Sequence, residues 1–161
     1  MHDANGPQRG LSRRDALRMA TVLGLACSSG VLSLSEVLAA DWNQRAFDAK
    51  AVADALQALG ADKFVVSPQV QLIAPDIAEN GAVVPVGVSS SAAQTTLMAI
   101  LIEKNPNPLS AMFHLPPGTA PQVNTRVKMS STSIVHALVQ ADGKWLLASK
   151  EIKVTLGGCG G

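Results

Sequence analysis

The sequence predicts a mainly β chain with one helix near its start. From residue 64 onward, apolar and polar residues alternate with the short period of β-strands. Clusters of Gly, Pro, Asn and Asp separate these runs at spacings of roughly 8 to 14 residues. No run of helical period lies between them. About seven strands in this pattern indicate an immunoglobulin-like β-sandwich.

Residues 41–60 carry the expected helix. Asp41 is placed to cap it, and Gln44 stands three residues later as the return partner of a capping box. Apolar residues then recur at helical spacing as far as Leu59, and Gly60 supplies the stop. We expect one amphipathic helix of about five turns over 41–59. Its apolar stripe is expected to pack on the domain, with a partner-facing role as the alternative.

The strands of the domain, residues 61–156, are bounded by turn signals. Asn80-Gly81 is a hairpin-type turn signal, and Pro85 favours an edge position or a bulge for its strand. Asp142-Gly143 is the strongest hairpin signal and joins the last two strands. The paired cysteines and central Trp of antibody modules are missing, so the prediction concerns architecture alone. The expected strands cover 69–74, 83–89, 95–103, 111–115, 122–129, 133–140 and 144–156.

The first 40 residues have the order of a secretory signal. Arginines precede an uncharged stretch, 19–34, and small residues follow at Ala39 and Ala40, where cleavage is expected. The uncharged stretch is too short and too rich in Ser and Gly for a stable membrane anchor. The segment around Arg13 and Arg14 resembles the twin-arginine signal, although Ala16 stands where that motif usually has Phe. We therefore expect export to the periplasm by the twin-arginine pathway.

Composition excludes several classes of partner. Apolar residues make up 47% of the chain and charged residues 16%, so a packed core is expected. Aromatic residues make up 3%, which leaves few platforms on which bases could stack. Of 13 basic and 12 acidic residues, four and three lie before residue 41, which leaves nine of each. A neutral mature chain predicts no binding to nucleic acid.

One cysteine remains in the expected mature chain. Cys27 lies in the leader, whereas Cys159 stands between Gly157-Gly158 and Gly160-Gly161. Five residues with one side chain bury no apolar area, so we expect a mobile arm that can carry the thiol into a narrow cleft. No neighbouring charge strongly favours the thiolate, which predicts a thiol that other proteins act upon. An incidental tail cysteine and half of an intermolecular disulfide are the alternatives.

Other candidate sites are weak. His114 and His136 lie on different predicted strands, and the mature chain lacks a second cysteine, so neither a metal site nor a cofactor is expected. Residues 89–91, three serines, are interpreted as a loop. Asp76 with Glu79, and Arg126 with Lys128, are interpreted as solvated surface pairs. No catalytic residue is predicted.

Four segments of the chain resemble a known family. They are Glu79-Asn80-Gly81-Ala82-Val83-Val84-Pro85-Val86, Glu103-Lys104-Asn105-Pro106-Asn107-Pro108-Leu109, Thr125-Arg126-Val127-Lys128-Met129 and Lys153-Val154-Thr155-Leu156-Gly157-Gly158-Cys159-Gly160-Gly161. They closely resemble the SoxY family, the sulfur carriers of the bacterial Sox thiosulfate-oxidation system. The ending is the most specific of the four.

The resemblance implies a carrier without turnover of its own. In this family the cysteine that matches Cys159 accepts thiosulfate oxidatively from the haem protein SoxAX, which gives a cysteine S-thiosulfonate. SoxB then removes sulfate, and SoxCD, where present, oxidises the remaining sulfane sulfur. The resemblance also implies a heterodimer with SoxZ and an immunoglobulin-like fold. Whether the host has SoxCD, and so whether sulfate or elemental sulfur results, stays open.

Two other classes of function remain as alternatives. A thiol redox enzyme would need a base or a resolving cysteine near Cys159, and the sequence places neither there. A secreted structural β-sandwich, dimerised through a Cys159 disulfide, accounts for the thiol but leaves the glycines on both sides unexplained.

Overall fold

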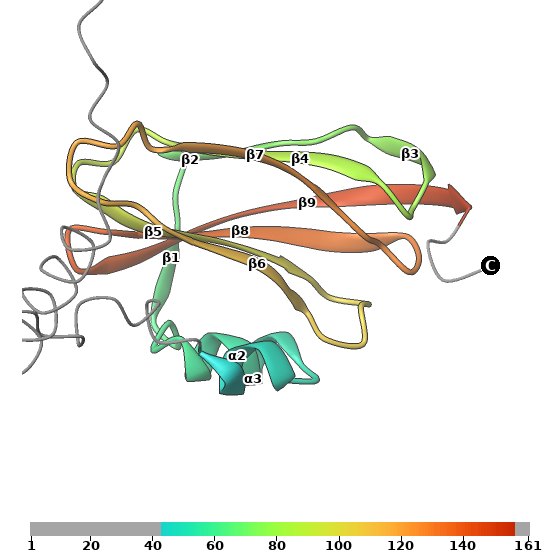
Figure 1. Ribbon diagram of the computed structural model, residues 1–161, viewed down its shortest axis with the longest axis horizontal. Helices are drawn as coiled ribbons and strands as arrows, with labels where there is room; N and C mark the ends of the chain where they lie inside the picture. Colours follow the sequence, from blue (N-terminus) through green and yellow to red (C-terminus); the bar gives the residue numbers. More distant parts are fainter. Residues whose placement is uncertain (1–42, 157–161) are drawn as a thin grey trace, which may run out of the picture. The chain divides into compact units, whose positions relative to one another are not determined.

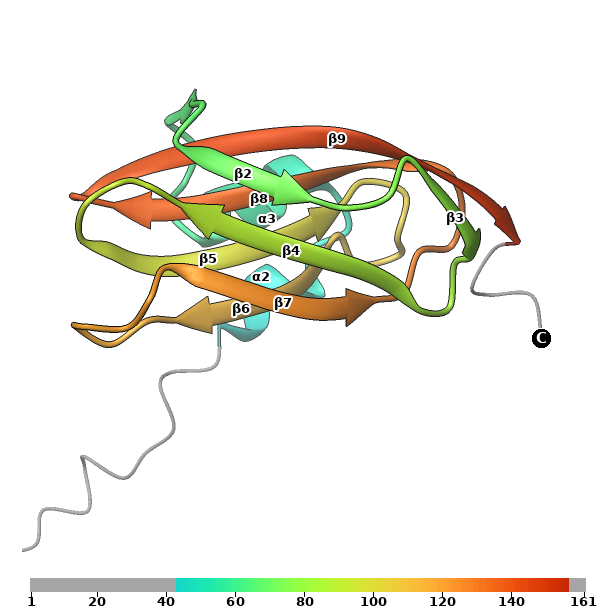
Figure 2. The same ribbon diagram turned by 90° about the horizontal axis from the view of Figure 1, so that it is seen from above.

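The computed structural model describes residues 43–156, which form two stacked β-sheets with two short helices against the larger one (Figure 1). The larger sheet has the strand order β1-β9-β8-β5-β6, and β3 also pairs with β9. The smaller sheet has the order β2-β4-β7 and lies over the larger one in Figure 2. The mainly β sandwich predicted from the sequence is confirmed. The strands are β1 Phe64–Val66, β2 Val70–Ile73, β3 Ile77–Asn80, β4 Val84–Ser90, β5 Thr95–Ile102, β6 Leu109–His114, β7 Gln122–Val127, β8 Ser133–Ala141 and β9 Lys144–Leu156.

Strand β5 lies inside the larger sheet, between β8 and β6, and is apolar along almost its whole length because both of its faces are covered. Met98, Ile100 and Ile102 face the smaller sheet and belong to the main core. Leu97, Ala99 and Leu101 face the opposite way and pack with residues of the helices. Alternation of side chains across a strand therefore supplies two separate apolar clusters.

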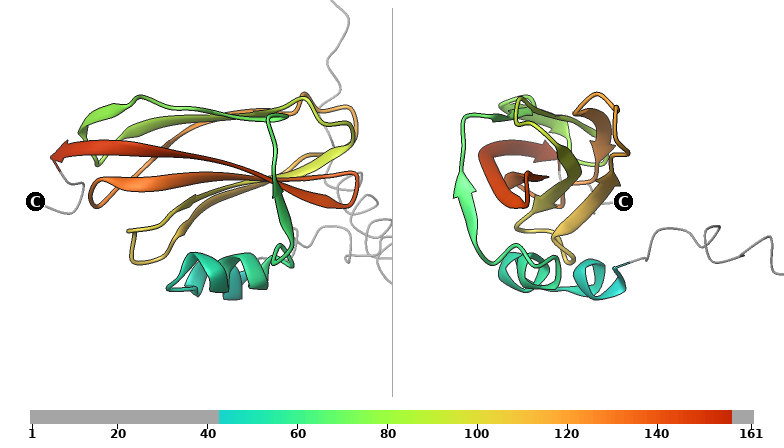
Figure 3. Two further views of the ribbon diagram at one scale, coloured as in Figure 1. Left: turned by 180° about the vertical axis from the view of Figure 1, so that it is seen from behind. Right: turned by 90° about the vertical axis from the view of Figure 1, so that its left-hand side faces the viewer.

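Two helices replace the single helix predicted for 41–59. They are α2 Gln44–Asp48 and α3 Val52–Ala58, and Ala49 and Ala51 between them have extended backbone angles. Asn43 caps α2 by accepting a hydrogen bond from the Ala46 amide at 3.1 Å. The proposed cap, Asp41, lies outside the described residues. Both helices still bury their apolar side on the larger sheet, as expected, and Figure 3 shows them on its outer face.

The turn predictions differ in outcome. Asp142 and Gly143 both have positive φ, at 49° and 68°, and join β8 to β9 as the predicted hairpin. Gly60 ends α3 with φ of 70°, also as predicted. At Asn80-Gly81 the chain does turn, but β3 pairs with β9 and β4 with β2 and β7. This turn therefore joins two sheets and does not form a hairpin.

Two short strands were not predicted, and the strand for which Pro85 favours an edge position or a bulge is the middle strand of its sheet. Strands β1 and β3 both pair with β9 in parallel. Strand β4, which contains Pro85, is the middle strand of the smaller sheet. Its partner β2 reaches only from Ser90 to Gly87, so at Pro85 only β7 pairs with β4. The missing proline amide is tolerated because the strand has one partner there.

Of the predicted serine loop, Ser89 and Ser90 are the last two residues of β4, and Ser90 is buried. Its hydroxyl accepts hydrogen bonds from the Ala92 amide and the Thr95 hydroxyl, both at 3.1 Å. These bonds explain how a polar residue fits there. None of the helices in the described part of the chain is long and apolar enough to cross a membrane.

Candidate functional site

The predicted attachment residue Cys159 and its glycines, Gly157, Gly158, Gly160 and Gly161, lie outside the described residues, as do Arg13 and Arg14 of the leader. The structure does describe the base from which the carboxyl-terminal segment leaves the domain. That base is the end of β9, the longest strand, at Leu156. The contacts that hold this base decide how firmly Cys159 is tethered.

Strand β3 holds one side of the base. It runs parallel to β9 and pairs Ile77 with Lys153 and Asn80 with Leu156. The Gly81 amide donates to the Leu156 carbonyl at 2.7 Å. The Thr155 hydroxyl also donates to the Glu79 carbonyl at 2.9 Å. The last residues of β9 are therefore paired up to the start of the carboxyl-terminal segment.

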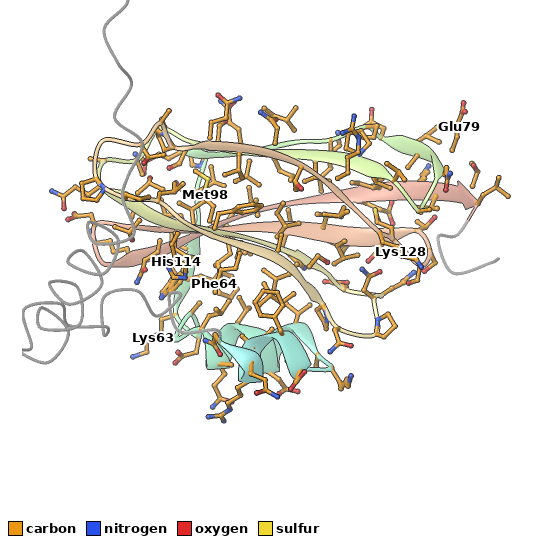
Figure 4. All side chains as sticks on the ribbon, viewed as in Figure 1. Lys63, Phe64, Glu79, Met98, His114 and Lys128 are labelled. Carbon is orange, nitrogen blue, oxygen red and sulfur yellow. The ribbon has the colours of Figure 1, made fainter. Side chains whose placement is uncertain are left out.

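The connection between β7 and β8 holds the opposite side. The Thr132 hydroxyl accepts a hydrogen bond from the Val154 amide at 2.9 Å. The Met129 amide donates to the Gly81 carbonyl at 2.7 Å, so the same connection also fixes the turn after β3. Figure 4 shows Glu79 and Lys128 at this end of the sandwich. Two segments from distant parts of the sequence, β3 with the turn after it and the β7–β8 connection, thus converge on the end of β9.

An ion pair ties the start of β3 to β9. The Lys150 ammonium lies 2.9 Å from the Asp76 carboxylate and donates to the Ala74 carbonyl at 2.5 Å. The hydrogen bond from Lys150 and its positive charge hold the pKa of Asp76 below its ordinary value. The Lys153 amide donates to the Asp76 carbonyl at 2.9 Å. Asp76 is solvated, as predicted for it together with Glu79, and it also has Lys150 as an ion-pair partner.

Exposed apolar side chains surround the base. Ile77 is 58% exposed, Val83 53% and Leu156 69%. Ile77 lies on β3 and Leu156 on β9, and these two strands pair. Val83 lies in the turn after β3, and its amide donates to the Asn80 carbonyl. An exposed apolar surface of this kind is suited to contact with other proteins.

The two histidines stay apart, as the sequence predicted. His114 ends β6 at the end of the sandwich away from the base, as Figure 4 shows. His136 on β8 bonds the Ser149 hydroxyl at 2.7 Å and the Glu103 carboxylate at 3.0 Å. Among residues 43–156 there is no group of three or more His, Cys, Asp or Glu side chains that could hold a metal ion.

Sequence reasoning missed the His136 cluster and the pairing of β3 with β9. Glu103 directly follows β5, His136 lies on β8 and Ser149 on β9, and only the order of these neighbouring strands brings the three residues together. Strand β3 is four residues long, with a proline two residues before it and a turn after it. Its apolar residues gave too short a pattern for a strand prediction.

Comparison with known families decides the assignment. The model of the family described as "SoxY: Sulfur oxidation protein SoxY" matches residues 55–159, which is more than half of the chain and ends at Cys159. The chain belongs to the SoxY family. It is thus a sulfur oxidation protein of a carrier family.

Solved structures agree with the SoxY assignment. The sulfur carrier protein SoxY from Chlorobium limicola f thiosulfatophilum is 37% identical with a TM-score of 0.59, over 71% of this chain and 100% of that one. A superoxide reductase (neelaredoxin) from Ignicoccus hospitalis is 17% identical with a TM-score of 0.48, over 53% and 79% of the two chains. The second likeness carries no argument. A search of the curated proteins found no match.

Proposed function

We propose that this protein is a periplasmic sulfur carrier that holds thiosulfate-derived sulfur on Cys159 during thiosulfate oxidation. The observation that carries the proposal is a family match that extends from the domain through the glycines to Cys159. The protein is in this view a substrate of its partner enzymes and has no catalytic residue. Export by the twin-arginine signal around Arg13 and Arg14 would bring it to the periplasm.

The loading step is an oxidation at sulfur. The Cys159 thiol gives up its proton, and its sulfur bonds to the outer sulfur of thiosulfate, which forms a cysteine S-thiosulfonate. Two electrons leave in this step, and the haem protein SoxAX would take them. On SoxB, water then hydrolyses the bond between the sulfonate group and the adjacent sulfur, which releases sulfate and leaves a persulfide on Cys159. SoxCD, where the host has it, would oxidise that sulfur further.

The base of the arm suits this role. Hydrogen bonds from β3, Gly81 and Thr132 fix β9 as far as Leu156. Cys159 stands three residues beyond, a reach of about 10 Å for extended chain. Flanking glycines present no side chains to the walls of a cleft. A fixed base with a slender extension would let one thiol enter the active sites of several transient partner enzymes. SoxZ would be the stable partner subunit.

The test is thiosulfate-dependent electron transfer in a Sox system reconstituted with SoxZ, SoxAX and SoxB. Cys159→Ser should lower the rate to the background without carrier, because a hydroxyl is a poor nucleophile at neutral pH and cannot hold a sulfur chain. Normal transfer by Cys159→Ser would rule out the proposal.

A further inference from the structure

Strand β9 has an interrupted edge. On the side away from β8 it pairs with β1 through residues Trp145, Leu146 and Leu147, and with β3 from Lys153 onward. Residues 148–152 between these two ladders have no strand partner on that side among residues 43–156. We call this segment the open edge of β9. Figure 2 shows β9 along the border of the sheet, with β3 beside its end.

The backbone of Ser149 and Glu151 faces this open edge. On the same side, the Leu147 carbonyl accepts from Ser67 and the Lys153 amide donates to Asp76. Backbone groups of a strand point alternately to its two sides, so residues 149 and 151 point the same way as 147 and 153. No residue of the described chain forms a hydrogen bond with these two amides and two carbonyls from that side. Four backbone groups are thus available in a row.

The flanks of the open edge are apolar and exposed. Val65 and Val66 of β1 are 61% and 74% exposed, and Ile77 of β3 is 58% exposed. Proteins commonly protect such edges with proline or with free charges. Lys150 is the lysine within the open edge, and its ammonium is already bound to Ala74 and Asp76. Glu151 is exposed and is the charge left free in this segment, which contains no proline. The open edge therefore has little protection against an added strand.

The shape of the edge restricts what can fill it. Strands β1 and β3 each stand one strand further out than β9, so the open edge is a recess of five residues, roughly 17 Å long. Two copies of this chain cannot bring their open edges together, because these flanking strands would meet first. Within the described chain, β3 already occupies the edge next to Leu156, the last described residue of β9. The occupant must therefore be an extended segment of another polypeptide.

We propose that the open edge of β9 receives a β-strand from a different protein, and that in the carrier complex this protein is the partner subunit. Its backbone would bond Ser149 and Glu151, and its apolar side chains would contact Val65, Val66 and Ile77. This identification of the occupant rests on the proposed partnership with SoxZ. It also places the partner on the strand that leads to Cys159.

Hydrogen exchange tests the inference directly. The probe is SoxZ, added in excess to the ¹⁵N-labelled mature protein, and the readout is the exchange rate of single amides. Ser149 and Glu151 should exchange at least about tenfold more slowly in the complex, because a hydrogen-bonded amide must open before it exchanges. Gly118, in the loop after β6, should be unchanged. A complex that leaves Ser149 and Glu151 unprotected would overturn the inference.

A proline variant supplies a second test. Glu151→Pro removes the amide that faces the open edge while the amides of the neighbouring residues still reach β8. Its Kd for SoxZ should be at least about tenfold higher than that of Glu151→Ala, which keeps the amide. If Glu151→Pro does not fold, Val66→Lys should weaken binding while Ala120→Lys, in a distant exposed loop, does not. Equal binding by each pair would overturn the inference.

The outcomes also separate this inference from the proposed function. If SoxZ does not bind the wild-type protein, the partner and the strand addition both fail, while sulfur loading of Cys159 is measured independently. If SoxZ binds and the open edge stays unprotected, only the strand addition fails.

Discussion

Lys150 connects β9 to the chain just before β3. Its backbone belongs to the strand that ends at the carrier segment, and its ammonium binds Ala74 and Asp76, which lie just before β3. This contact sets the position at which β3 begins to pair with β9. Because the Asp76 side chain is 89% exposed, water and salt weaken the ion pair, and its effect on stability is small.

Asp76→Asn should therefore lower the melting temperature slightly at neutral pH. Lys150 depresses the folded-state pKa of Asp76, so this contribution to stability is present above the ordinary pKa of an aspartate. It is lost as the pH falls through the depressed pKa. Thermal unfolding from pH 7 to pH 2 should show the difference between wild type and Asp76→Asn vanish in acid. A difference that stays constant over this range would contradict the ion-pair assignment.

The Thr132 hydroxyl accepts a hydrogen bond from Val154 at the end of β9, the base of the carboxyl-terminal segment. Thr132→Val keeps the shape of the side chain but leaves the Val154 amide without its acceptor. The free energy of unfolding in urea should fall by about 1–2 kcal/mol. Thr132→Ser retains the hydroxyl and should lose much less. If the valine and serine variants were equally stable, this hydrogen bond would not hold the base.

At the scale of elements, the glycines on both sides of Cys159 are expected to determine access to partner active sites. Gly158→Val and Gly160→Val should slow sulfur loading by SoxAX and processing by SoxB, because a branched side chain stiffens and widens the segment. Gly158→Ala is the matched control and should slow it less. Unfolding and thiol titre should stay as in the wild type. Full activity of both valine variants would remove the role of the glycines.

The elements that could be predicted from sequence are those with a strong local signal. Asp142-Gly143 identified the β8–β9 hairpin because its turn type requires two residues with positive φ. The apolar run of β5 identified a buried strand. The break between α2 and α3 was missed because the apolar spacing continues across Ala49 and Ala51, since both helices pack on the same cluster.

The base of the carboxyl-terminal segment could be predicted only in part. The glycines and Cys159 are plain in the sequence, but the contacts that fix Leu156 come from Gly81 and Thr132, far away along the chain. Parallel pairing of β1 and β3 with β9 leaves no local pattern, because these strands are three and four residues long. Such pairings follow from the topology of the whole domain.

At the scale of the whole molecule, the leader is expected to decide where the carrier works. Arg13→Lys together with Arg14→Lys should stop export, because lysine cannot reproduce the planar donor geometry of the guanidinium groups. Fractionation of cells that produce the double variant should find the precursor in the cytoplasm. Export at the wild-type rate would identify an ordinary secretory signal. A pathway for folded cargo could also carry bound SoxZ.

We expect Cys159 to carry the sulfur, and intact-mass spectrometry of the mature protein shows whether it does. After incubation with thiosulfate, SoxAX and an electron acceptor, the protein should gain about 112 Da, the mass of one added thiosulfate group. Fragmentation should place this mass on Cys159, and Cys159→Ser should gain none. A mass gain elsewhere in the chain, or a disulfide dimer of doubled mass as the only product, would contradict the account.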